Sequence, residues 1–217
     1  MYRFGGNWKN RARVTRPRFA AIMASIAGFT AAALLVGSVL SSQAAATANY
    51  LPDITLENQH RQSLSLASLR GKPVLVGFIH TMCKGPCEML TSKMQSVSAA
   101  LPAAHNVTML LITTDPADDQ PPELMAYAKK QSLSGNEWIL VTGPHRSIKR
   151  VMRIYGVSHE ESDDTMMHVM KLFLVAPDGS LTHTYSGMNA SPQAVASDIK
   201  TLSRQDSAAS QHSSSLQ

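Results

Sequence analysis

The two cysteines of the chain, Cys83 and Cys87, are the residues whose type and spacing point most directly to chemistry. They follow an apolar run, Val74 to Ile79, and a helix-like pattern begins directly after them. Unpaired backbone N–H groups and the helix dipole at a helix N-terminus favour an anion, so a thiolate is expected to form more easily there. Two thiols at such a corner could bind a metal, transfer electrons or close a structural disulfide.

The spacing of the two cysteines favours some of these functions over others. Residues four apart on a helical turn lie on one face, so the two sulfurs could share one ion or form a short-loop disulfide. A structural bridge is the least favoured, because so small a loop constrains the unfolded chain little. Thioredoxin-type redox proteins have two intervening residues, whereas this chain has three. Spacing alone leaves metal binding and redox chemistry as alternatives.

A metal site needs a third ligand, and His168 is the best candidate. It stands just before a predicted buried strand, and the loops at the strand ends of an α/β sheet gather at one edge. A lone loop histidine is, however, more often simply solvated. His80 is a rival, although the alternation of the preceding strand could turn it away from the thiols. The other histidines stand in turns or polar contexts and are interpreted as surface residues: His60, His105, His145, His159, His183 and His212.

Two thiolates and one imidazole suit copper, because thiolates select Cu(I) and imidazole tolerates Cu(II). Zinc could use the same ligands with an added water. Asp115 follows the second predicted buried strand, and we expect it near the site, orienting a ligand or accepting a proton, or else only forming a turn. Most nearby methionines are interpreted as packing residues, with Met89 and Met94 packing on the helix. The methionines near the site are Met82, Met89, Met166, Met167 and Met170.

Alternating strand and helix patterns surround these residues and predict an α/β fold with a mixed sheet in one domain. An N-terminal β-hairpin is expected within residues 50–70. Further strands are predicted at 74–79, 106–113, 138–141, 169–175 and 181–185, and helices from Pro86, at about 122–131, around 148–155 and from Pro192 to about 202. The Ser- and Gln-rich segment 204–217 has little to bury and is predicted to be disordered.

Charge is distributed unevenly along the chain. The formal net charge is +5, but six basic residues precede residue 19 and no acidic residue precedes Asp53. Without those six, 14 basic residues remain against 15 acidic ones. The body therefore lacks the cationic patch that nucleic-acid binding requires.

The basic segment 1–18 flanks an uncharged stretch, 19–40, that is long enough to span a bilayer. The basic flank predicts a cytoplasmic N-terminus, and the small residues that follow are compatible with signal cleavage. Segment 19–48 is therefore either a membrane anchor or a signal peptide. Both alternatives place the functional domain, 49–203, in a periplasm-like space where disulfides are permitted.

Four segments together resemble the Sco/SenC family in order and spacing: FIHTMCKGPCEML, LITTDPADDQPPELMAYAKK, ILVTGPHRSIKRVMRIYGV and MHVMKLFLVAPDG. The resemblance covers about residues 52–203. It implies a membrane-tethered, thioredoxin-like protein that binds copper through Cys83, Cys87 and His168. Lys84 and Glu88 depart from the family pattern, which usually has proline after each cysteine, and Met167 replaces an acidic residue that is common before the histidine.

The resemblance implies a copper metallochaperone that delivers one ion to the CuA site of cytochrome c oxidase during assembly. The alternative is a thiol–disulfide reductase that uses Cys83 and Cys87 to keep a partner's cysteines reduced. A weaker third hypothesis is a peroxide-reducing or redox-sensing protein with Cys83 as the reactive thiolate.

Overall fold

A seven-stranded mixed β-sheet forms the centre of the computed structural model, which describes residues 48–103, 105–157, 170–186 and 189–214, with side chains to residue 205. The strand order is β2-β1-β5-β4-β3-β6-β7. The strands are β1 (Thr55–Asn58), β2 (Ser63–Ser65), β3 (Val74–Ile79), β4 (Thr108–Thr113), β5 (Trp138–Thr142), β6 (Lys171–Val175) and β7 (Leu181–Ser186). β3, β4 and β5 are parallel, and β1 and β6 run antiparallel to their neighbours. The predicted mixed sheet and N-terminal hairpin are confirmed.

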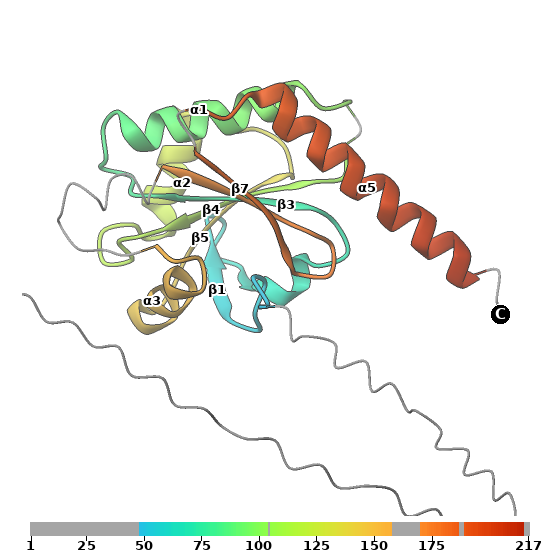
Figure 1. Cartoon of the computed structure of the whole chain (residues 1–217). Helices are drawn as coiled ribbons and strands as arrows, with labels where there is room; N and C mark the ends of the chain where they lie inside the picture. The colour runs from blue at the N-terminus through green and yellow to red at the C-terminus, as the bar shows by residue number, and fades with distance from the viewer. Residues whose placement is uncertain (1–47, 104, 158–169, 187–188, 215–217) are drawn as a thin grey trace, which may run out of the picture. The chain divides into compact units, whose positions relative to one another are not determined.

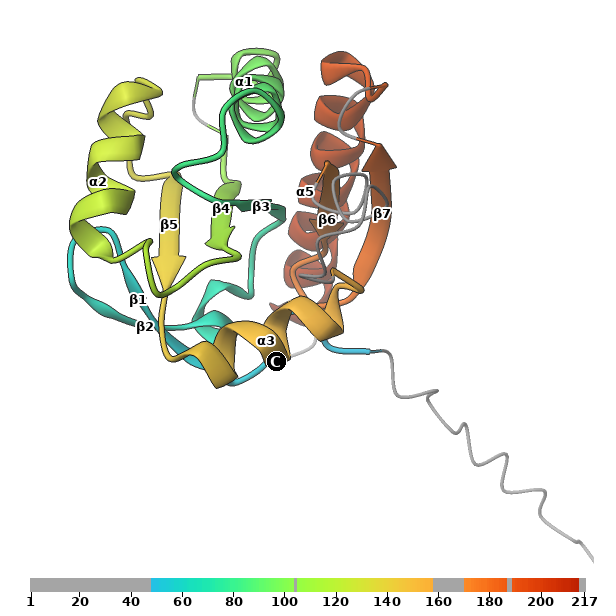
Figure 2. The same ribbon diagram turned by 90° about the vertical axis from the view of Figure 1, so that its left-hand side faces the viewer.

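Helices cover both faces of the sheet (Figures 1 and 2). The helices α1 (Pro86–Ala99), α2 (Pro121–Lys130) and α5 (Pro192–Ser214) contribute to one apolar core. α3 (His145–Ile154) and the short 3₁₀ helix η1 (Leu66–Leu69) contribute to the other. Since both faces are covered, β3 and β4 are buried along their whole length, as expected for the central strands of a parallel sheet.

β3 supplies alternate side chains to the two cores. Leu75 and Ile79 pack in the core under α1, and Val76 and Phe78 pack in the core under α3. Gly77 lies on the α1 side, and a Cβ atom there would meet Met94 Sδ at 3.1 Å and Leu111 Cδ2 at 3.2 Å. The missing side chain therefore lets α1 approach β3 closely.

The helix boundaries agree with the sequence prediction except at the C-terminus. We expected the last helix to end near residue 202 and a disordered segment to follow, but α5 continues to Ser214. A polar sequence can extend a helix that is already nucleated, because each further residue adds one backbone hydrogen bond. Within the described residues, no helix is both long and apolar enough to cross a membrane. The predicted segment 19–40 lies outside those residues.

Candidate metal centre

Cys83 lies in the segment that joins β3 to α1, and Cys87 lies in the first turn of α1, at the corner that the sequence predicted. Figure 2 shows this segment leaving β3 and entering α1. The N–H of Cys83 donates to the carbonyl of His80 at 3.0 Å, which forms a tight turn after the strand. Gly85 then adopts a φ of 92°, in the left-handed region that glycine tolerates. Pro86 occupies the first turn of α1, where its missing N–H costs little. Cys83 therefore belongs to the turn, and Cys87 to the helix.

The two thiols are both free but have different surroundings. Cys83 is partly exposed, whereas Cys87 is only 1% exposed. Burial, and to a lesser extent a side-chain hydrogen bond with Cys83, raise the pKa of Cys87 to about 12. We expected the helix N-terminus to favour a thiolate, and for Cys87 this expectation is wrong. Desolvation disfavours the charged form more strongly than the backbone favours it.

Contacts with α2 hold the first turn of α1 in place. The carbonyl of Cys87 accepts hydrogen bonds from Thr91 Oγ1 at 2.9 Å and from the Tyr127 hydroxyl at 3.3 Å. These two hydroxyl groups also lie 2.8 Å apart. Burial raises the pKa of Tyr127 to about 12, so its hydroxyl stays protonated and available as a donor. At the surface, Lys130 pairs with Glu88 at 2.7 Å.

Asp119 is a buried residue of the site that sequence reasoning missed. Its side chain is fully buried and accepts hydrogen bonds from both the N–H and the hydroxyl of Thr81, and from the hydroxyl of Thr113. These bonds tie the cysteine turn to the end of β4. Asp119 follows two other acidic residues in a polar segment, and the sequence contains no signal that separates the buried aspartate from the exposed one before it.

Asp115 lies beside the cysteine turn, at the sheet edge where the sequence placed it. Ile79 and Thr113 are paired in the β3–β4 ladder, so the residues that follow them leave the sheet side by side. Asp115 Oδ2 is 4.0 Å from His80 Nε2. In the described part of the chain, the Asp115 carboxylate accepts a hydrogen bond from the N–H of Ala117 and faces His80, the alternative candidate ligand.

The remaining predicted residues fall into two groups. His168, Met166 and Met167 lie outside the described residues, so the third ligand stays a prediction. Of the methionines expected to pack, Met94 is buried, but Met89 is 48% exposed, and that interpretation of Met89 is wrong. Met82, directly before Cys83, is 69% exposed.

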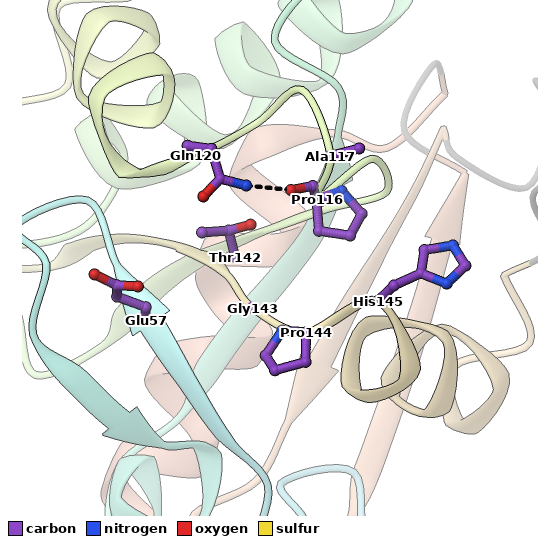
Figure 3. Close-up of a pocket in the computed structure, with 8 residues that line it drawn as sticks. All are labelled: Glu57, Pro116, Ala117, Gln120, Thr142, Gly143, Pro144 and His145. Atoms are coloured by element: carbon purple, nitrogen blue, oxygen red, sulfur yellow. Dashed lines mark hydrogen bonds between the residues drawn. The ribbon is translucent and has the colours of Figure 1, made fainter.

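A cavity of about 490 Å³ lies on the neighbouring loops rather than at the cysteine turn. It is lined by Glu57, Pro116, Ala117, Gln120, Thr142, Gly143, Pro144 and His145 (Figure 3). Figure 3 shows the Glu57 carboxylate and the His145 imidazole on opposite sides of the cavity. The amide N–H of Gln120 donates to the Pro116 carbonyl. These polar groups do not converge on one point, so the cysteine corner remains the better candidate site.

Comparison with known proteins places these features in one family. The SCO1/SenC family model matches residues 42–204. The SCO1 protein homolog of Bacillus subtilis (strain 168) is 31% identical over 157 residues, which cover 69% of this chain and 80% of the relative.

Solved structures show the same fold. BsSco, a Sco-family cytochrome c oxidase assembly protein in which a disulfide switch was identified, is 27% identical, with a TM-score of 0.62 over 73% of this chain and 96% of that one. Bradyrhizobium japonicum ScoI, solved with copper bound, is 23% identical, with a TM-score of 0.56 over 68% of this chain and 96% of that one. The expected thioredoxin-like fold is confirmed.

Proposed function

The chain belongs to the SCO1/SenC family, and on this premise we propose that it is a copper metallochaperone. Cys83, Cys87 and His168 bind one copper ion and deliver it to a respiratory oxidase that carries a CuA site, during assembly of that oxidase. The observation that carries the proposal is the pair of free thiols, close enough to share a hydrogen bond, at the strand-to-helix corner. Two relatives support it by what they do: one is a cytochrome c oxidase assembly protein, and one was solved with copper.

The donor set fits copper chemically. Sulfurs that already share a hydrogen bond can bind one ion with little movement of the backbone. Thiolates are soft ligands that select Cu(I), and an added imidazole from His168 also allows Cu(II). Thiols must lose their protons to bind a metal. Because Cys87 is protonated in the copper-free protein at neutral pH, copper binding there releases that proton.

The unequal exposure of the thiols suggests how the ion leaves. A partner's thiolate can approach the ion from the side of Cys83, which is partly exposed. Cys87 holds the ion from the interior, where Thr91 and Tyr127 fix its backbone. Stepwise exchange of ligands then passes copper to the partner without releasing it into water.

Anaerobic Cu(I) titration of the reduced full-length protein tests this proposal. We expect one ion per chain, and an affinity for Cu(I) that is at least about tenfold weaker in Cys83→Ser, Cys87→Ser and His168→Ala. Even the loss of a residue that only hydrogen-bonds a metal ligand lowers metal affinity by about tenfold or more. His60→Ala, which removes an exposed imidazole in the β1–β2 turn, is the matched control. If His168→Ala binds as tightly as the parent with the same spectrum, the ligand assignment is wrong.

A second candidate function is reduction of a partner's disulfide. Cys83, the accessible thiol, would attack one partner sulfur as a thiolate and release the other as a thiol. Cys87 would then attack Cys83, close the Cys83–Cys87 disulfide and release the second partner thiol, so that two electrons and two protons pass to the partner. Activity on a disulfide-bonded peptide that is lost in the cysteine variants and kept in His168→Ala would favour this function.

We also propose that the domain functions on the periplasmic side of the inner membrane, with residues 19–40 serving as an anchor or a cleaved signal peptide. This rests on the basic flank and uncharged length of that segment. Cell fractionation followed by intact-mass measurement distinguishes the alternatives: a membrane-bound full-length chain indicates an anchor, and a shortened periplasmic chain indicates cleavage. Recovery in the cytosol would contradict both.

A further inference from the structure

We propose that His80, Asp115 and Asp118 form a second metal site, for a divalent cation of borderline softness such as Zn²⁺ or Cu²⁺. One ligand atom from each of these residues lies within 4.8 Å of the other two. None of the three is a ligand in the copper site proposed above, so this inference goes beyond the proposed function and does not depend on it.

The backbone holds the two contributing loops together without any metal. His80 follows β3 directly, and Asp115 and Asp118 follow β4, its parallel neighbour. The N–H of Thr114 donates to the carbonyl of Ile79 at 2.8 Å, which extends the pairing beyond the strands. The N–H of Asp119 donates to the carbonyl of Asp115 at 2.9 Å and closes the turn that carries both aspartates. The site is therefore preorganised by the sheet edge.

The side chains of Asp115 and His80 face each other. The N–H of Ala117 donates to Asp115 Oδ1 at 3.2 Å, and the other oxygen, Oδ2, faces His80 Nε2 at 4.0 Å. That distance is too long for a direct hydrogen bond. The Nε2 atom of His80 is nevertheless buried and has no hydrogen-bond partner in the described part of the chain. A buried polar atom without a partner is costly, and a cation between the two groups would satisfy both.

The distances need only a small adjustment. Nitrogen and oxygen ligands bind Zn²⁺ at about 2.0–2.2 Å in a tetrahedral arrangement. Two ligand atoms on one ion therefore lie closer together than the 4.0 Å between His80 Nε2 and Asp115 Oδ2. Rotation of side chains supplies the difference, and Asp118 is exposed and free to approach. Waters would complete the coordination.

The donor types separate this site from the cysteine pair. One imidazole nitrogen and two carboxylate oxygens suit Zn²⁺ and Cu²⁺, whereas Cu(I) prefers sulfur. The sites are also adjacent, because the carbonyl of His80 accepts the N–H of Cys83. An ion bound to the His80 side chain would therefore restrain the turn that carries the exposed thiol.

The test uses the full-length Cys83→Ser/Cys87→Ser/His168→Ala variant, which lacks all three proposed copper ligands. Calorimetric titration with ZnCl₂ should show one ion per chain. Adding His80→Ala or Asp115→Asn should weaken Zn²⁺ binding at least about tenfold. The loss of a residue that only hydrogen-bonds a ligand already lowers metal affinity by about that factor. The matched control, His60→Ala, should leave binding unchanged. With Cu²⁺, pulsed electron paramagnetic resonance should detect one coordinated imidazole that disappears in His80→Ala.

Three outcomes would overturn the proposal: no saturable binding of one ion, binding that His80→Ala leaves intact, or binding that only Asp118→Asn reduces, which would indicate ions gathering on an exposed acidic surface. Asp115→Asn keeps the acceptor for Ala117, so it serves as the second test if His80→Ala fails to fold by circular dichroism. Failure here leaves the Cu(I) titration of the cysteine site unaffected, because that experiment measures different ligands.

Discussion

Only three residues separate Cys83 and Cys87, yet the fold leaves the Cys83 thiol partly exposed and buries the Cys87 thiol in the core. Cys83 belongs to a turn, whereas Cys87 lies on the inner side of α1, where burial raises its pKa. The accessible thiol is therefore the one that a partner or reagent meets first. In either proposed function, Cys83 is the thiol that a partner protein contacts first. Cys87 is the buried second ligand, or the second thiol of the disulfide.

This difference predicts selective alkylation. In the native protein at pH 8, iodoacetamide should label Cys83 first, because a thiol with a pKa of about 12 is a thiolate in only about one molecule in ten thousand at that pH. Peptide mass spectrometry after short labelling measures the order. In denaturant the two cysteines should react alike, and equal labelling in the native state would contradict the assigned burial of Cys87.

Asp119 is predicted to stabilise the cysteine turn. Replacing it with alanine leaves the Thr81 and Thr113 donors without their acceptor, so we expect the free energy of unfolding to fall by about 2–4 kcal/mol. Urea denaturation in metal-free buffer measures the change. Asp118→Ala, at the exposed neighbouring position, is the control and should change stability by less than about 0.5 kcal/mol; equal effects would refute the role of Asp119.

At the scale of elements, the position of α1 on β3 determines where the thiols lie. Gly77 permits the close approach, and Thr91 and Tyr127 join α1 to α2 through the carbonyl of Cys87. The α1 N-terminus is thus held from two directions, by the sheet below and by α2 beside it. The site depends on these packing contacts as much as on the residues of the turn.

Gly77→Ala is expected to push α1 away from the sheet. The new methyl group would meet Met94, Leu90 and Leu111 at 3.1–3.2 Å, and overpacking of this kind costs about 1–3 kcal/mol. Thermal and urea denaturation would measure the loss. Combining Gly77→Ala with Met94→Ala should cost less than the sum of the two single changes, because the smaller side chain makes room. If the two losses of stability simply add, the contact between the new methyl group and Met94 is not the cause of the destabilisation.

For the whole molecule, buried weak acids on both sides of the α1–α2 contact predict sensitivity to alkaline pH. Burial raises the pKa values of Cys87 and Tyr127 to about 12, from ordinary values of 9.0 and 10.0. Above pH 9 the unfolded chain therefore loses protons that the folded chain keeps. The stability present below pH 9 is lost as the pH rises toward 12, by up to about 1.4 kcal/mol per pH unit for each group.

Urea midpoints measured between pH 7 and pH 11 test this expectation. Tyr127→Phe removes one of the two groups, so its stability should decline less steeply with pH than that of the parent. A midpoint that stays constant across this range, or an identical slope in the variant, would mean that Tyr127 is not protected in the folded state.

The sequence alone determined the features that depend on local patterns. The apolar runs at 74–79 and 106–113 predicted two buried strands, and Pro86 together with the periodic Leu90 and Met94 predicted the helix that follows the cysteines. Hydrophobic periodicity reflects which faces of a helix or strand must be buried, so these elements can be predicted from the sequence alone. The resemblance to the Sco/SenC family, also carried by these local segments, was confirmed by the comparisons.

Only the tertiary structure decided what depends on contacts between distant segments. The raised pKa of Cys87, the buried carboxylate of Asp119 and the facing of His80 and Asp115 all arise where the ends of β3 and β4 meet α1 and α2. Local sequence indicates neither burial nor the orientation of a polar side chain, because both are set by neighbours 30 or more residues away along the chain. Composition alone also did not predict the continuation of α5 to Ser214, because a helix that is already nucleated can propagate through polar residues.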